Sequence, residues 1–190
     1  MKYVAFLRGI NVGKNKLIPM DVLKNIFLDM GFSSPKTYLR SGNVVFENNN
    51  DSNYNDLAVM EIANSISKNI EKFFGFYVEV IVKNKEGIDF LIGNNPYFDD
   101  NPIEKLYVTI FKNKIDEKLS KKLVKEFINL GNDDNVDEFT ISKDRDIVYL
   151  LCKSKYHKTK FNNNFFESKL DNIATTRNWK TICKIRDMLN

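Results

Sequence analysis

Hydrophobic and polar positions change period repeatedly along residues 1–83. Alternation predicts a strand at residues 2–10, and further strands are predicted at residues 36–40, 43–47 and 76–82. Apolar residues three or four positions apart predict a helix that begins at Pro19 and a longer helix that Gly75 ends. A tight turn at Ser41-Gly42 is expected between the second and third strands. The resulting order, β-α-β-β-α-β, is that of a ferredoxin-like domain.

The same order of elements is predicted a second time in the rest of the chain. Residues 85–92 have the pattern of a short helix, and residues 94–102 hold two of the four prolines, so residues 84–103 are interpreted as a connection. Beyond it the predicted elements are strands at 105–111, 136–142, 147–152 and 173–176 and helices at 116–130, 161–170 and 179–189. The predicted fold is therefore α+β, with two ferredoxin-like α/β plait domains at residues 1–83 and 104–190 and an extra C-terminal helix.

Composition places the chain among folded proteins without membrane spans. Hydrophobic residues make up 43% and charged residues 28% of the 190 positions, unlike disordered or collagen-like chains. No apolar stretch approaches the roughly 20 residues of a membrane helix, and the run at residues 3–7 is too short for a signal peptide before Arg8 interrupts it. We therefore expect a cytoplasmic protein with no membrane partner.

Histidine and cysteine, which often act as catalytic groups or metal ligands, are scarce: the chain has one histidine and two cysteines. Cys152 and Cys183 have no neighbouring cysteine at metal-binding or redox spacing, so buried thiols are the favoured interpretation. The one histidine, His157, lies in a different predicted domain from Ser41, and no nucleophile frame surrounds that serine, so a Ser-His-Asp triad is not expected. The acidic run at residues 132–138 lacks the glycine and glutamate of a calcium loop. No metal and no cofactor are expected, and whether the chain is an enzyme stays open.

A glycine-containing loop at residues 9–15 follows the first predicted strand. A Walker loop needs four residues between its glycines and a hydroxyl residue after the lysine, whereas this loop has three residues and Asn15. Nucleoside triphosphate hydrolysis is therefore rejected. Exposed backbone amides with Arg8, Lys14 and Lys16 suit a phosphate or carboxylate instead. A solvated loop that needs glycine for its backbone is an equally supported alternative.

Topology predicts which segments lie beside this loop. In a ferredoxin-like domain the first strand runs antiparallel to the third, so the end of one lies beside the start of the other. Residues 8–13 and 41–43 should then be neighbours and can form one pocket.

The net charge of +4 conceals an uneven distribution. Residues 147–186 contain nine basic and two acidic residues. Within this segment, residues 153–161 alternate cations with aromatic rings, a composition that suits phosphates and stacked bases. We call residues 153–160 the basic loop; its candidate nucleic-acid contacts are Lys153, Lys155, Tyr156, Lys158 and Lys160. The predicted strands carry no RNP-like aromatic motif. A solvated surface loop is the favoured interpretation, with nucleic-acid binding as the alternative function.

Three separated segments, residues 6–13, 38–46 and 174–179, together resemble the bacterial family called domain of unknown function 1697. The Asn95-Pro-Tyr97 turn and the strand after it are also similar to that family. The resemblance implies paired α/β plaits and brings no established activity. Lys14 departs from the family, which often has a second glycine at this position.

The resemblance also implies a place for a site. The matching positions are Arg8, Asn11, Ser41, Asn43, Thr176, Arg177, Asn178 and Trp179. Structural roles are available, since Asn178 can cap the last helix and Trp179 can anchor it. The functional hypothesis is that a small anionic or phosphate-bearing ligand binds at the cleft between the domains, where Arg8 and Arg177 converge on it. The candidate ligand-binding residues are Arg8, Asn11, Lys14, Ser41, Asn43, Arg177 and Asn178.

Overall fold

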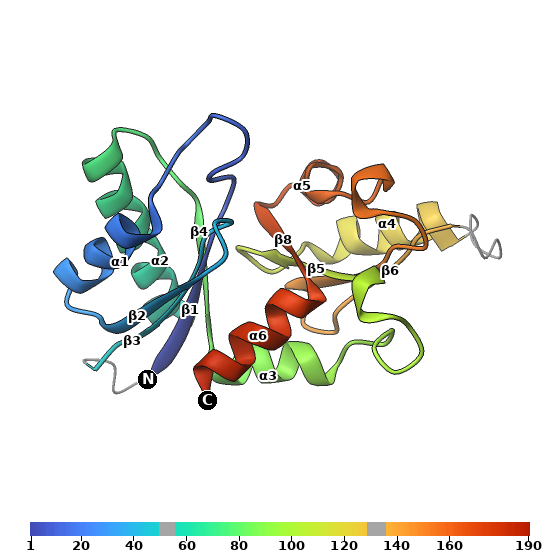
Figure 1. Cartoon of the computed structure of the whole chain (residues 1–190). Coiled ribbons are helices and arrows are strands. Elements are labelled where there is room, and N and C mark those ends of the chain that lie inside the picture. Colours follow the sequence, from blue (N-terminus) through green and yellow to red (C-terminus); the bar gives the residue numbers. More distant parts are fainter. Residues whose placement is uncertain (50–55, 129–135) are drawn as a thin grey trace. The chain divides into compact units, whose positions relative to one another are not determined.

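The computed structural model describes residues 1–49, 56–128 and 136–190. Contacts divide the chain into two compact units. Unit 1 comprises Met1–Asp89 and Lys184–Asn190, and unit 2 comprises Phe90–Cys183. Each unit has a four-stranded antiparallel sheet, which confirms the α+β fold of two similar plaits (Figure 1). The predicted domain limits stay a prediction, because a unit defined by contacts need not fold alone.

Unit 1 contains the first β-α-β-β-α-β set. Its elements are β1 (Lys2–Leu7), α1 (Met20–Asp29), β2 (Ser33–Tyr38), β3 (Asn43–Glu47), α2 (Asp56–Phe74) and β4 (Val80–Asn84), and the strand order is β2-β3-β1-β4. Both predicted helices are confirmed. Strand β4 starts later than predicted because Val80 pairs with Leu7, the last residue of β1, and the residues before Val80 have no strand residue opposite them.

The connection between β2 and β3 corrects one prediction. Tyr38 pairs with Asn43, so four residues form the loop and the two-residue turn at Ser41-Gly42 is wrong. Leu39 has φ of 58°, in the left-handed region, which ends β2 before the loop. The Asn43 side chain then closes the loop by donating from Nδ2 to the carbonyl of Tyr38 at 2.8 Å.

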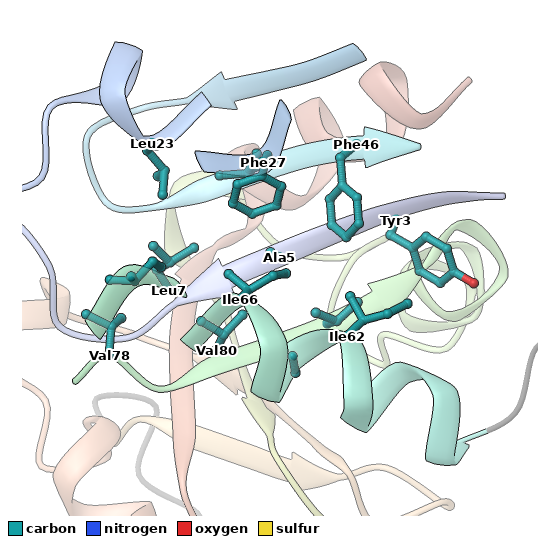
Figure 2. Close-up of a cluster of buried hydrophobic side chains, with 14 of the residues drawn as sticks. Tyr3, Ala5, Leu7, Leu23, Phe27, Phe46, Ile62, Ile66, Val78 and Val80 are labelled. Atoms are coloured by element: carbon teal, nitrogen blue, oxygen red, sulfur yellow. The ribbon is translucent and has the colours of Figure 1, made fainter. Parts of the chain in front are cut away.

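The core of unit 1 lies between its sheet and two helices. Alternate residues of β1, β3 and β4 face α1 and α2 and pack against apolar residues of these helices. Figure 2 labels ten members of this cluster: Tyr3, Ala5, Leu7, Leu23, Phe27, Phe46, Ile62, Ile66, Val78 and Val80. The residues between them on β1, Val4 and Phe6, are also buried. Strand β1 is therefore buried on both faces, which explains why it is an almost continuous apolar run.

Unit 2 repeats the topology. Its strands and helices are β5 (Leu106–Phe111), α4 (Glu117–Ile128), β6 (Glu138–Ile141), β7 (Ile147–Leu151), α5 (Asn163–Leu170) and β8 (Ala174–Asn178), in the order β6-β7-β5-β8. Pairing of β8 with β5 confirms the last predicted strand. Helices α3 (Lys85–Gly93) and α6 (Trp179–Leu189) each contain a boundary between the units.

The helix-covered face of the unit 2 sheet holds an aromatic cluster. Phe127, Phe139, Phe161, Phe165 and Phe166 make mutual ring contacts with centroids 5.0 to 6.2 Å apart. Phe161 was expected to be helical but precedes α5, because the Asn162 side chain caps the helix by accepting from the amide of Phe165 at 3.1 Å.

Some predicted segments lie wholly or partly outside the described residues. The first is the run at residues 48–53, whose polar composition predicts a connector. The others are the end of the helix predicted at 116–130, at residues 129–130, and the acidic run at 132–138. Within the described ranges, no helix is long and apolar enough to cross a membrane.

The two sheets are hydrogen-bonded alike at one end. The amide of the last residue in the first strand of each unit donates into the following hairpin loop: Leu7 to the Gly42 carbonyl at 2.8 Å, and Phe111 to the Asp146 carbonyl at 2.9 Å. The next amide reaches toward the last strand: Arg8 to Glu79 and Lys112 to Ile173, both at 2.8 Å. In unit 1 this end of the sheet carries the connections that hold Arg8, Asn11, Lys14 and Ser41.

Candidate functional site

The connection between β1 and α1 folds into a small hairpin of its own. The amide of Asn15 donates to the carbonyl of Val12 at 3.2 Å, and Gly13 has φ of 60°. A positive φ at the first central position is the geometry of a type II′ turn, which glycine adopts without strain. Lys14 occupies the second central position and is exposed. Among the described residues, the amides of Gly13 and Lys14 donate no backbone hydrogen bond.

Asn11 joins this connection to the β2–β3 loop. Its Nδ2 donates to the carbonyl of Arg40 at 2.8 Å and to that of Ile18 at 3.1 Å, while its Oδ1 accepts from the amide of Ile18 at 2.9 Å. A Cβ at Gly42 would lie 2.8 Å from Cδ1 of Ile10, which confirms that residues 8–13 and 41–43 are neighbours. The single pocket expected there stays a prediction. Asn11 itself is occupied by backbone groups, so its part in any site is to hold the two loops together.

Asn43 has a similar structural role. Its side chain is fully buried, and Nδ2 donates to the Tyr38 carbonyl and, at 3.2 Å, to the hydroxyl of Ser41. Ser41 is exposed beside it. Gly42 fits tightly, because a Cβ at this position would lie 2.7 Å from Cβ of Leu7. The loop backbone is therefore fixed in place below an accessible hydroxyl.

Four cationic side chains belong to these loops, which we call the loop end of unit 1 and define as residues 8–19 and 39–42. Arg8 is half-buried, and Lys14, Lys16 and Arg40 are exposed. Lys16 donates from Nζ to the carbonyl of Tyr77 at 2.6 Å. Sequence reasoning missed Arg40, although it stands inside the motif that identified Ser41 and Asn43. The loop end thus combines positive charge, a hydroxyl and unused amides.

Arg177 lies in unit 2 and is buried within β8. Its Nη1 donates to the hydroxyl of Thr175 at 2.7 Å and to the carbonyl of Thr176 at 3.0 Å. Burial lowers the pKa of Arg177 to about 10, because the charged guanidinium loses hydration there. Arg8 belongs to unit 1, whereas Arg177 belongs to unit 2. The convergence of the two arginines therefore stays a prediction.

The two residues that follow Arg177 have the structural roles considered as alternatives. Asn178 accepts a hydrogen bond at Oδ1 from the amide of Thr181 at 2.8 Å, as a helix-capping residue does. Trp179 is fully buried and packs against the rings of Phe98 and Tyr149, with centroids 5.7 and 6.4 Å away. Both residues fix the start of α6.

The basic loop at residues 153–160 is partly engaged in unit 2. Lys153 forms an ion pair with Glu138 at 2.9 Å. The ring of Tyr156 stacks on Tyr107 at 4.5 Å, and Lys160 lies over the ring of Phe127 at 4.8 Å. The remaining candidates for nucleic-acid contact, Lys155 and Lys158, are exposed.

The cysteines do not form a reactive centre. Burial raises the pKa of Cys152 to about 12, so its thiol stays protonated at neutral pH and is a poor nucleophile. Cys183 is half-buried in α6. Within the described ranges, no group of three His, Cys, Asp or Glu side chains is placed to hold a metal ion.

Comparisons with known proteins agree with the motifs and the fold. The family described as "Protein of unknown function (DUF1697)" matches residues 1–137. The solved structure of conserved bacterial protein SP0830 from Streptococcus pneumoniae is similar, with a TM-score of 0.64 and 22% identity over 99% of this chain and 97% of that chain. A search of curated proteins finds no match. The family match covers well over half of the chain, so the protein belongs to the DUF1697 family.

Proposed function

We propose that the loop end of unit 1 binds a small anionic or phosphate-bearing ligand. The observation that carries the proposal is the Asn11 side chain, which hydrogen-bonds the backbone of both loops. Because the loops are held together, the cations of each serve the same end of the sheet. A preformed arrangement of this kind loses little conformational entropy on binding.

The chemistry of the loop end suits an anion of more than one charge. Lys14 and Arg40 are exposed and have no acidic partner among the described residues. Ser41 adds a hydroxyl, and the amides at the tip of the Val12–Asn15 turn add uncharged donors. Exposed ion pairs contribute only about 0.2 to 1 kcal/mol each. Several must act together, so we expect dissociation constants between about 10 μM and 1 mM.

The alternative function, nucleic-acid binding at the basic loop, has weaker support. Tyr156 already stacks on Tyr107, so one face of its ring is covered, and Lys153 is paired with Glu138. Electrophoretic titration with single-stranded RNA and DNA at two salt concentrations tests it, because phosphate contacts weaken as salt rises. Absence of binding at low salt contradicts the alternative.

Thermal-shift measurements with phosphate, pyrophosphate and a panel of phosphorylated metabolites test the proposal. A ligand that binds only the folded state raises the melting temperature. The shift should shrink in Lys14→Gln and Arg40→Gln. Lys68→Gln is the matched control, since it removes the same charge from an exposed position on α2. Equal shifts in all three variants would contradict a site at the loop end.

A further inference from the structure

A groove of about 380 Å³ lies in unit 2 between α4 and the end of β6. The helix packs differently from its counterpart in unit 1. There α1 lies against the edge strand β2 and against α2, whereas α4 lies mainly against α5 and reaches the edge strand β6 through the ring contact of Phe127 with Phe139. The apolar residues Leu123 and Phe127 hold α4 on the aromatic core of unit 2. The edge of β6 is thus left with an open groove, in the size range of small-molecule sites.

Two rows of side chains on α4 form one wall. Residues four apart in a helix lie on the same face, and the groove is lined by Ser120 with Val124 and by Lys121 with Lys125. Val124 is 41% exposed although it is apolar. The helix therefore offers an apolar strip with two ammonium groups beside it.

The β6–β7 turn forms the opposite wall with Ile141, Ser142 and Arg145. Arg145 has φ of 56° and is fixed by backbone bonds on both sides: its amide donates to the Ser142 carbonyl at 3.0 Å, and its carbonyl accepts from the amide of Ile115 at 2.6 Å. The guanidinium therefore extends from a rigid point of the backbone. Ile141 continues the apolar strip across from Val124.

The groove carries excess positive charge. Glu117 is the acidic partner of both Lys121, at 2.7 Å, and Arg145, at 3.5 Å. Lys125 has no acidic partner in the described part of the chain. The hydroxyl of Ser120 is already bonded to the Glu117 carbonyl at 2.9 Å. Recognition of a polar head by this groove must therefore come from charge.

From these features we infer that the groove binds an amphipathic monoanion, with an apolar body along Val124 and Ile141 and a carboxylate facing the cations. A volume of 380 Å³ is that of about a dozen water molecules, so it accommodates a body and head of about a dozen non-hydrogen atoms. This site is separate from the loop end of unit 1 and does not depend on the function proposed for it.

Octanoate is a probe of suitable size and chemistry. We would titrate it into the ¹⁵N-labelled full chain and follow amide shifts. The expected result is saturable change in α4 and in residues 141–147. Two arms separate the contributions: 1-octanol keeps the apolar body without the charge, and acetate keeps the head without the body. Both should bind at least about five-fold more weakly, since each loses one of the two contributions.

Substitutions in and near the groove test whether octanoate binds there. Lys125→Gln and Arg145→Asn should each weaken octanoate about two- to five-fold, the effect of one exposed ion pair, and asparagine tolerates the positive φ of position 145. Val124→Glu should weaken it more, because it places a carboxylate in the apolar strip. Lys122→Gln is the matched control, on the same helix but outside the groove. The inference is overturned if octanoate shifts other regions, if octanol binds equally well, or if Lys122→Gln has the same effect as Lys125→Gln.

Discussion

The two units have one topology and the same hydrogen bonds at the loop end of each sheet, but they connect the first strand to the first helix differently. In unit 1 the connection spans residues 8–19 and holds itself in shape with the Val12–Asn15 turn and the Asn11 side chain. In unit 2 it spans only residues 112–116, and one backbone bond, from the Ile115 amide to Arg145, links it to the hairpin.

The difference shows that the sheets provide a common frame while the connections decide the chemistry, as is usual for functional loops. The long connection of unit 1 presents cations around a turn that suits a compact anion. The short connection of unit 2 leaves Arg145 at the groove beside α4. We therefore propose two kinds of anion site on one fold, and the following predictions test that contrast.

The largest effect is expected at the tightest contact. Gly42→Ala should lower the free energy of unfolding by about 2 to 4 kcal/mol, because the new Cβ collides with Leu7 and the backbone has positive φ. Asp146→Ala, at the corresponding position of unit 2, should cost about 1 kcal/mol, the contribution of a hydrogen bond to Ser142. Chemical denaturation measures both, and equal losses would contradict different loop supports.

Substitutions of Arg177 and Arg40 should separate effects on stability from effects on pyrophosphate binding. Arg177→Ala should lower the free energy of unfolding by about 2 to 3 kcal/mol, as removal of a large buried side chain does, and leave pyrophosphate binding unchanged. Arg40→Ala should change stability by less than about 0.5 kcal/mol and weaken pyrophosphate two- to five-fold. If both weaken binding equally, the sequence-based convergence of Arg8 and Arg177 is supported instead.

Asn11→Ala should lower the free energy of unfolding by about 2 kcal/mol, because three hydrogen bonds to partly exposed backbone groups are lost. Asn15→Ala, an exposed asparagine of the same loop, should change it by less than about 0.5 kcal/mol. Amide hydrogen exchange of Ile18 should rise in the first variant alone. Unchanged exchange would mean that Asn11 does not hold the loops.

The smallest effect is expected from Glu117 in unit 2. Glu117→Gln removes the carboxylate shared by Lys121 and Arg145, so octanoate should bind about two-fold more tightly. Fluorescence or NMR titration at neutral pH measures this. Weaker octanoate binding in this variant would indicate that Glu117 positions the cations rather than competing with the ligand.

The sequence predicted the order of elements and the meeting of the two unit 1 loops, because both follow from alternation, helical spacing and antiparallel topology. Loop geometry was less accessible. A left-handed Leu39 breaks the usual preference of leucine, so the length of the β2–β3 loop was missed. Arg177 was expected at a ligand because the family resemblance implied a site at its position and a guanidinium suits an anion. Its burial within β8 was missed. The groove beside α4 depends on how closely this helix packs against β6, and a local sequence pattern does not indicate that packing.

The central claim is an anion site at the loop end of unit 1, and amide shift mapping with pyrophosphate on the ¹⁵N-labelled full chain tests it most directly. We expect saturable shifts in residues 9–18 and 39–42, diminished in the Lys14→Gln variant and unaffected by octanoate. Shifts that do not saturate, or that concentrate in residues 153–160, would contradict it.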